Sequence, residues 1–94
     1  MTLDPNTLAA LIRADAESYV AQFNRDGTDA EFERLIARDK SALESVADLA
    51  EKADLRGAYR RWARLDTVVR EALSQRAWRA LTDGNAIGHT EHDR

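Results

Sequence analysis

The chain has 94 residues, a formal net charge of −3, no cysteine, four glycines and one proline. Its length indicates one domain, and the lack of cysteine excludes disulfides, thiolate catalysis and cysteine-ligated metal sites. No basic region followed by an apolar run stands at the N-terminus, and the apolar stretches are short. We therefore expect a soluble, cytoplasmic protein without a signal peptide or a membrane span.

Charge is distributed unevenly along the chain. Residues 1–54 hold twelve acidic and six basic side chains, whereas residues 55–79 hold seven arginines and two acids. The composition is rich in alanine, leucine, arginine and glutamate, which are good helix formers. We expect a helical protein with an acidic half and a basic segment.

The first predicted helix begins after Asp4, which can cap it, and Pro5 suits the first helical position. Apolar residues then recur at helical spacing, at Leu8, Leu11, Ile12, Ala16, Tyr19 and Phe23. We expect this helix to end within residues 24–27, because Gly27 can adopt the left-handed conformation found after many helices.

The second predicted helix opens at Thr28, which has the spacing of a capping box with Glu31. Its apolar stripe consists of Phe32, Leu35, Ile36, Leu43, Val46, Ala47, Leu49 and Ala50. The opposite side, which should face water, carries Glu33, Glu44 and Glu51. Asp39 is the exception, because it lies within the apolar stripe.

The third predicted helix has an apolar stripe at Leu55, Ala58, Tyr59, Trp62, Leu65, Val69, Ala72, Leu73 and Ala80. This stripe and that of the second helix point in nearly opposite directions, so we predict a turn between Lys52 and Gly57 with Asp54 as a cap. A single uninterrupted helix is the alternative and would give an extended dimer. The third helix should stop at Asp83 and Gly84, which makes residues 1–84 the domain and residues 85–94 a flexible polar tail.

Together the patterns predict an all-α three-helix bundle, in which the second and third helices form a long antiparallel pair beside a shorter N-terminal helix. In the predicted core, the third helix packs its side chains against those of the second. The third helix contributes Trp62, Leu65 and Val69, and the second contributes Ile36, Leu43 and Val46. One short helix cannot cover both long stripes, so we also expect dimerisation into a larger bundle.

The third helix carries Arg56, Arg60 and Arg64 in line at a spacing of four, and Trp78 falls on the same side further along. One interpretation is a solvated face whose arginines pair with acids of the first two helices. A second is a protein-binding face, since arginine and tryptophan often anchor interfaces. A third is nucleic-acid binding, with arginines on phosphates and Trp78 stacked on a base, although the acidic total charge opposes it.

Residue patterns for catalysis or a cofactor are missing from the sequence. His89 and His92, the two histidines of the chain, both lie in the polar tail, so we expect neither a nucleophile–base pair nor a metal site. Asp39 and Arg76 are the charged residues placed near the apolar stripes of the second and third helices. They are predicted to form a partly buried ion pair that fixes register or oligomer state.

Two segments, LDPNTLAALI (Leu3 to Ile12) and DLRGAYRRWARLDTVV (Asp54 to Val69), resemble those of a group of small actinobacterial helical proteins associated with toxin–antitoxin loci. The first matches their opening Asp-Pro and short amphipathic helix, and the second their arginine–tryptophan helix. The long acidic middle, residues 24–53, departs from that group, as does the lack of an Asp-Pro after the second segment. The resemblance implies a small regulatory or neutralising protein and brings no catalytic residues with it.

We therefore expect a non-enzymatic protein-binding module, such as an adaptor, an inhibitor or an antitoxin-like protein, that forms a homodimer. Its acidic half suits a basic protein partner and its arginine face suits an acidic one. One alternative is a nucleic-acid-associated protein that uses the arginines of the third helix and Trp78. Another is a structural subunit of a larger phage or secretion assembly.

Overall fold

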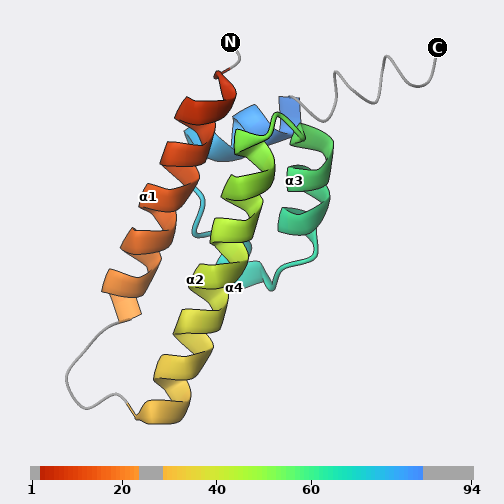
Figure 1. Ribbon diagram of the computed structural model, residues 1–94. Coiled ribbons are helices and arrows are strands. Elements are labelled where there is room, and N and C mark those ends of the chain that lie inside the picture. The colour runs from red at the N-terminus through yellow and green to blue at the C-terminus, as the bar shows by residue number, and fades with distance from the viewer. Residues whose placement is uncertain (1–2, 24–28, 84–94) are drawn as a thin grey trace.

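The computed structural model describes residues 3–23 and 29–83, and all of the regular structure in these ranges is helical. The elements are α1 (Pro5–Phe23), α2 (Ala30–Glu51), α3 (Leu55–Ala63), α4 (Thr67–Arg70) and a last helical segment, residues 75–83. Figure 1 shows α1 and α2 as a long antiparallel pair, with the three shorter helices gathered around one half of it. The predicted all-α class is confirmed. None of the helices described here is long and apolar enough to cross a membrane.

α1 begins as the sequence predicts. Pro5 is its first residue, and the Asp4 carboxylate accepts hydrogen bonds from the Thr7 amide at 2.9 Å and from the Thr7 hydroxyl at 2.7 Å. These bonds stabilise the charged form of Asp4 and lower its pKa. The predicted end of the helix at residues 24–27 lies outside the described residues.

α2 begins one residue later than predicted. Its cap is Asp29, whose carboxylate accepts a hydrogen bond from the Phe32 amide at 2.7 Å. The first amides of a helix have no carbonyl partner within it, and the Asp29 carboxylate supplies one. The predicted cap, Thr28, lies outside the described residues.

The turn between α2 and α3 confirms the predicted break between Lys52 and Gly57. Ala53 has a left-handed backbone with a φ of 65°, and the Asp54 amide donates to the carbonyl of Leu49 at 3.0 Å. The Asp54 carboxylate then accepts from the Gly57 amide at 2.9 Å and caps α3. The chain therefore reverses here with an alanine where a glycine is more usual.

The prediction of one long third helix is wrong. The chain leaves helix at Arg64, where the Arg64 and Leu65 amides bond to carbonyls only three residues earlier. Asp66 precedes the one-turn α4, and Ser74 precedes residues 75–83 with its hydroxyl accepting from the Ala77 amide at 3.3 Å. The long antiparallel pair is consequently α1 and α2, and five helices replace the predicted three in the described chain.

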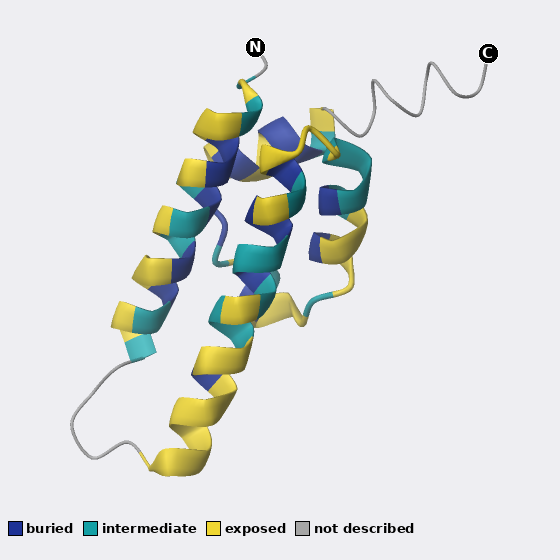
Figure 2. Ribbon diagram, in the orientation of Figure 1, coloured by how far each residue is buried: buried dark blue, intermediate teal, exposed yellow. Residues whose placement is uncertain are grey.

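The core lies between α1, the upper part of α2 and the shorter helices (Figure 2). Its largest fully buried side chains are Leu8, Ile12, Leu43, Val46 and Leu81. The residues predicted to meet there are buried in one cluster, except that Leu65 is only half-buried at its edge. Burial falls off toward the start of α2, where Phe32 and Leu35 are 37% and 43% exposed.

Candidate functional site

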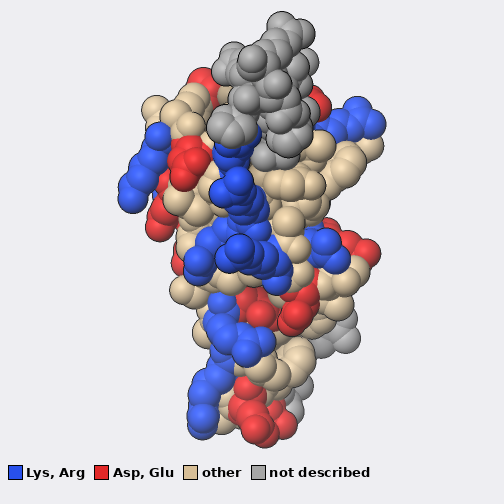
Figure 3. All heavy atoms as spheres, turned by 90° about the vertical axis from the view of Figure 1, so that its right-hand side faces the viewer, with Lys and Arg blue, Asp and Glu red and all other residues tan. Residues whose placement is uncertain are grey.

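The predicted arginine face lies on α3 and the residue that caps it. Arg60 and Arg64 are exposed, and Arg56 is half-buried. Figure 3, which views the molecule from the α3 side, shows basic side chains gathered in a band along this face. The three predicted positions therefore belong to a surface rich in positive charge.

Arg61 joins this surface, although sequence reasoning did not single it out. Its Nε donates a hydrogen bond of 2.6 Å to the Ser45 hydroxyl, which itself donates to the Ala42 carbonyl on α2. This contact holds the guanidinium of Arg61 between the two helices. The signal was present as an exposed arginine next to Arg60, but its partner on α2 depends on how the helices pack.

An open hollow of about 400 Å³ lies between these arginines and the end of α2. Its lining combines three cationic side chains with apolar ones: Leu49, Gly57, Arg60, Arg61, Arg64 and Leu65. Cationic groups around an apolar floor suit a ligand that presents carboxylates beside aliphatic groups.

Several acids of α1 and α2 are bound by basic residues of the same two helices. Arg13 binds Asp48 at 2.8 Å and Glu51 at 3.0 Å, and both contacts raise the pKa of the guanidinium. Lys40 binds Glu17 at 2.8 Å, which raises the pKa of the lysine. Within the described ranges, none of the ion pairs includes an arginine of the α3 hollow. The interpretation in which Arg60 and Arg64 pair with acids of the first two helices is therefore wrong for this structure.

Trp78 does not lie on the arginine face, contrary to prediction. It projects from residues 75–83 and is 40% exposed. The predicted alignment with Arg60 assumed one uninterrupted helix, and the chain turns at Arg64 and again before Ser74. Of the predicted binding residues, Arg60 and Arg64 thus line one hollow and Trp78 lines another.

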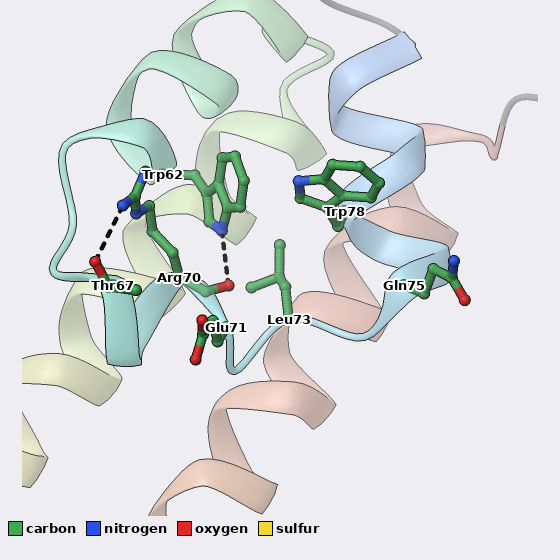
Figure 4. Close-up of a pocket in the computed structure, with 7 residues that line it drawn as sticks. All are labelled: Trp62, Thr67, Arg70, Glu71, Leu73, Gln75 and Trp78. Atoms are coloured by element: carbon green, nitrogen blue, oxygen red, sulfur yellow. Dashed lines mark hydrogen bonds between the residues drawn. The ribbon is translucent and has the colours of Figure 1, made fainter.

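Trp78 lines a second hollow, of about 420 Å³, together with Trp62, Thr67, Arg70, Glu71, Leu73 and Gln75. Figure 4 shows Leu73 between the two indole rings. The indole of Trp62 donates to the Arg70 carbonyl at 3.1 Å, and Arg70 Nη2 donates to the Thr67 hydroxyl at 3.2 Å. The Nε of Arg70 is buried without a hydrogen-bond partner. These bonds fix the wall of the hollow and leave Trp78 as its exposed edge.

The predicted ion pair between Asp39 and Arg76 is not formed. Asp39 is partly buried on α2 and accepts a hydrogen bond of 2.8 Å from the Tyr19 hydroxyl on α1. Arg38 also approaches it, at 3.8 Å, while Arg76 is exposed on residues 75–83. Burial, followed by the bond to Asp39, raises the pKa of Tyr19 to about 12. Asp39 therefore links α1 to α2, and Arg76 takes no part.

Metal-binding groups of three or more His, Asp or Glu side chains do not occur among residues 3–23 and 29–83. His89 and His92 lie outside these residues, as does the predicted flexible tail. No family model, curated protein or solved structure matches the chain.

Proposed function

We propose that this chain is a non-enzymatic, cytoplasmic protein-binding module of the adaptor, inhibitor or antitoxin-like kind. It binds an acidic segment of a protein partner in the hollow formed by Arg60, Arg61 and Arg64. The observation that carries the proposal is the exposure of these arginines next to apolar Leu49 and Leu65. Among the described residues, the ion pairs between α1 and α2 are formed by Arg13 and Lys40 instead.

The composition of the hollow favours a protein over a nucleic acid. Leucine side chains on its floor match aliphatic groups of a peptide, whereas a phosphate backbone offers none. Stacking on a base would require an aromatic ring in the hollow, whereas its lining residues are aliphatic, glycine and arginine, and Trp78 lines the other hollow. The remaining acidic surface of α1 and α2 repels polyanions and steers a partner whose charge is more localised.

The test is fluorescence anisotropy of a labelled helical peptide carrying glutamates around two leucines, titrated with the full chain. We expect Arg60→Gln with Arg64→Gln to weaken binding by about 2- to 30-fold, since two exposed ion pairs contribute up to about 1 kcal/mol each. The matched control is Arg76→Gln with Arg79→Gln, which removes the same charge from exposed positions outside the hollow. This control should bind the peptide nearly as the native chain does.

A second titration distinguishes binding of a protein partner from binding of a nucleic acid. Labelled single- and double-stranded oligonucleotides are titrated at low and at physiological salt. Binding that is tighter than to the peptide, falls steeply with salt and is lost in the Arg60 and Arg64 variant would replace the proposal with phosphate binding. Equal losses in both arginine variants would show that net charge, and not the hollow, governs binding.

A further inference from the structure

The first half of α2 extends past the helices that cover its second half. Every residue from Ala30 to Arg38 is exposed except Ile36. In Figure 2 the first turns of α2 extend below the shorter helices and below the end of α1. Phe32 and Leu35 are large apolar side chains that remain exposed there.

The side of this segment that carries Glu31 and Leu35 continues the side that α3 covers higher up. Ser45 bonds to Arg61 of α3, and Leu49 lines the hollow with the α3 arginines. Residues seven apart on a helix point in nearly the same direction. Arg38 and Ala42 stand seven residues before this pair, and Glu31 and Leu35 stand fourteen before it. Because α3 has only nine residues, it ends before it reaches them.

Charge on this side is arranged for pairing with a copy of itself. Glu31 lies about one turn before Leu35 and Arg38 about one turn after it. A second α2 laid antiparallel across Leu35 brings each Glu31 next to the other chain's Arg38, with the two leucines in contact at the centre. This is the self-complementary arrangement that a two-fold interface requires.

We infer that the face formed by Glu31, Leu35, Arg38 and Ala42 binds a second copy of this chain through an antiparallel α2–α2 contact. Arg38 is available for it, because its side chain is 69% exposed and its contact with Asp39 spans 3.8 Å. Asp39 is held instead by the Tyr19 hydroxyl at 2.8 Å. Few turns of helix take part, so the interface falls short of the roughly 1,600 Å² of a standard stable complex, and the dimer dissociates on dilution.

This inference does not depend on the proposed binding of an acidic partner. The hollow of Arg60, Arg61 and Arg64 is formed by α3 and the end of α2, whereas the inferred face lies on the first half of α2. Sedimentation of the full chain over a range of concentrations tests it directly. We expect a monomer–dimer equilibrium that Leu35→Arg shifts to monomer by at least about tenfold in dissociation constant. The matched control is Val68→Arg on α4, which adds the same charge at an apolar side chain 58% exposed and should leave the equilibrium unchanged.

A charge-exchange experiment identifies the surface even if Leu35→Arg perturbs folding. Glu31→Lys alone and Arg38→Glu alone each place like charges across the two-fold contact, so each variant is expected to be monomeric. An equimolar mixture restores opposite charges at both positions, and a heterodimer should form. A native chain that stays monomeric at every concentration would overturn the inference. So would a dimer that survives both single changes, or a mixture that remains monomeric.

Discussion

Replacing Tyr19 with phenylalanine removes a single hydroxyl and the hydrogen bond that it donates to Asp39. The ring is 5% exposed and packs 4.9 Å from that of Phe23, and phenylalanine preserves both features. A hydrogen bond to a charged group contributes about 1.5–3 kcal/mol. Water can reach the Asp39 side chain, which is 16% exposed, so we expect the lower end of that range, about 1.5 kcal/mol.

The measurement is chemical denaturation followed by circular dichroism, for Tyr19→Phe, Asp39→Ala and the double variant. If the two side chains stabilise the fold through their mutual bond, the double variant should lose about 1 kcal/mol less than the sum of the single losses. For a chain of this length, the loss in Tyr19→Phe corresponds to a fall in Tm of about 6–12 °C.

Arg76→Gln serves as the control that distinguishes the structure from the sequence-based pairing. Because Arg76 is exposed, its replacement should change the free energy of unfolding by less than about 0.5 kcal/mol. Destabilisation by Arg76→Gln as large as that by Tyr19→Phe would contradict the Tyr19–Asp39 bond as the stabilising contact. So would coupling of Asp39→Ala to Arg76→Gln together with additivity between Asp39→Ala and Tyr19→Phe.

Three further predictions follow from single sites. Because the pKa of Tyr19 is raised to about 12, ionisation of this group should leave the free energy of unfolding unchanged below pH 10 and lower it as the pH rises toward 12; the phenolate absorbance lost in Tyr19→Phe should titrate near 12, and titration near 10 would contradict this. Ala53→Gly should leave stability unchanged or raise it by up to about 1 kcal/mol, because a left-handed alanine is strained; thermal melts showing a clear loss would argue against that turn. Leu43→Ala should cost about 2–5 kcal/mol in urea denaturation because Leu43 is fully buried, and a loss below 1 kcal/mol would place it at the surface.

Local chemistry accounts for the parts of the fold that the sequence predicts well. α1 begins at Pro5, and the carboxylate of Asp4 caps it. The carboxylate of Asp54 caps α3 in the same way, and each carboxylate accepts a hydrogen bond from the amide three residues later. The end of α2 was predicted from a change in the direction of the apolar stripe. Signals of this kind depend on a few neighbouring residues, and little else in the molecule can override them.

The breaks in the third helix depend on contacts between distant residues. Trp62, Leu65, Val69 and Leu73 keep helical spacing, so the apolar pattern alone favours one helix. In the structure the Ser74 amide instead donates to Asp15 on α1 at 2.8 Å, and the Trp62 indole donates to the Arg70 carbonyl. Both bonds hold the chain in turns, and neither partner can be identified from the pattern of a single helix.

The partner of Asp39 was missed for a related reason. A carboxylate on an apolar stripe needs a donor, and the sequence offers both Arg76 and Tyr19. Which donor reaches it depends on which helix lies beside this part of α2. Once the break at Arg64 directs the chain away, α1 is that helix, and Tyr19 becomes the nearest donor.

The same helix, α2, also explains how acidic and basic side chains are arranged around it. Asp48 and Glu51 lie on the side of α2 that faces α1, where Arg13 binds both. The side that faces α3 carries Ser45, whose hydroxyl accepts a hydrogen bond from Arg61, and Leu49, which lines the hollow with Arg60 and Arg64. The carboxylates that bind Arg13 and the arginines of the α3 hollow therefore lie on different sides of α2.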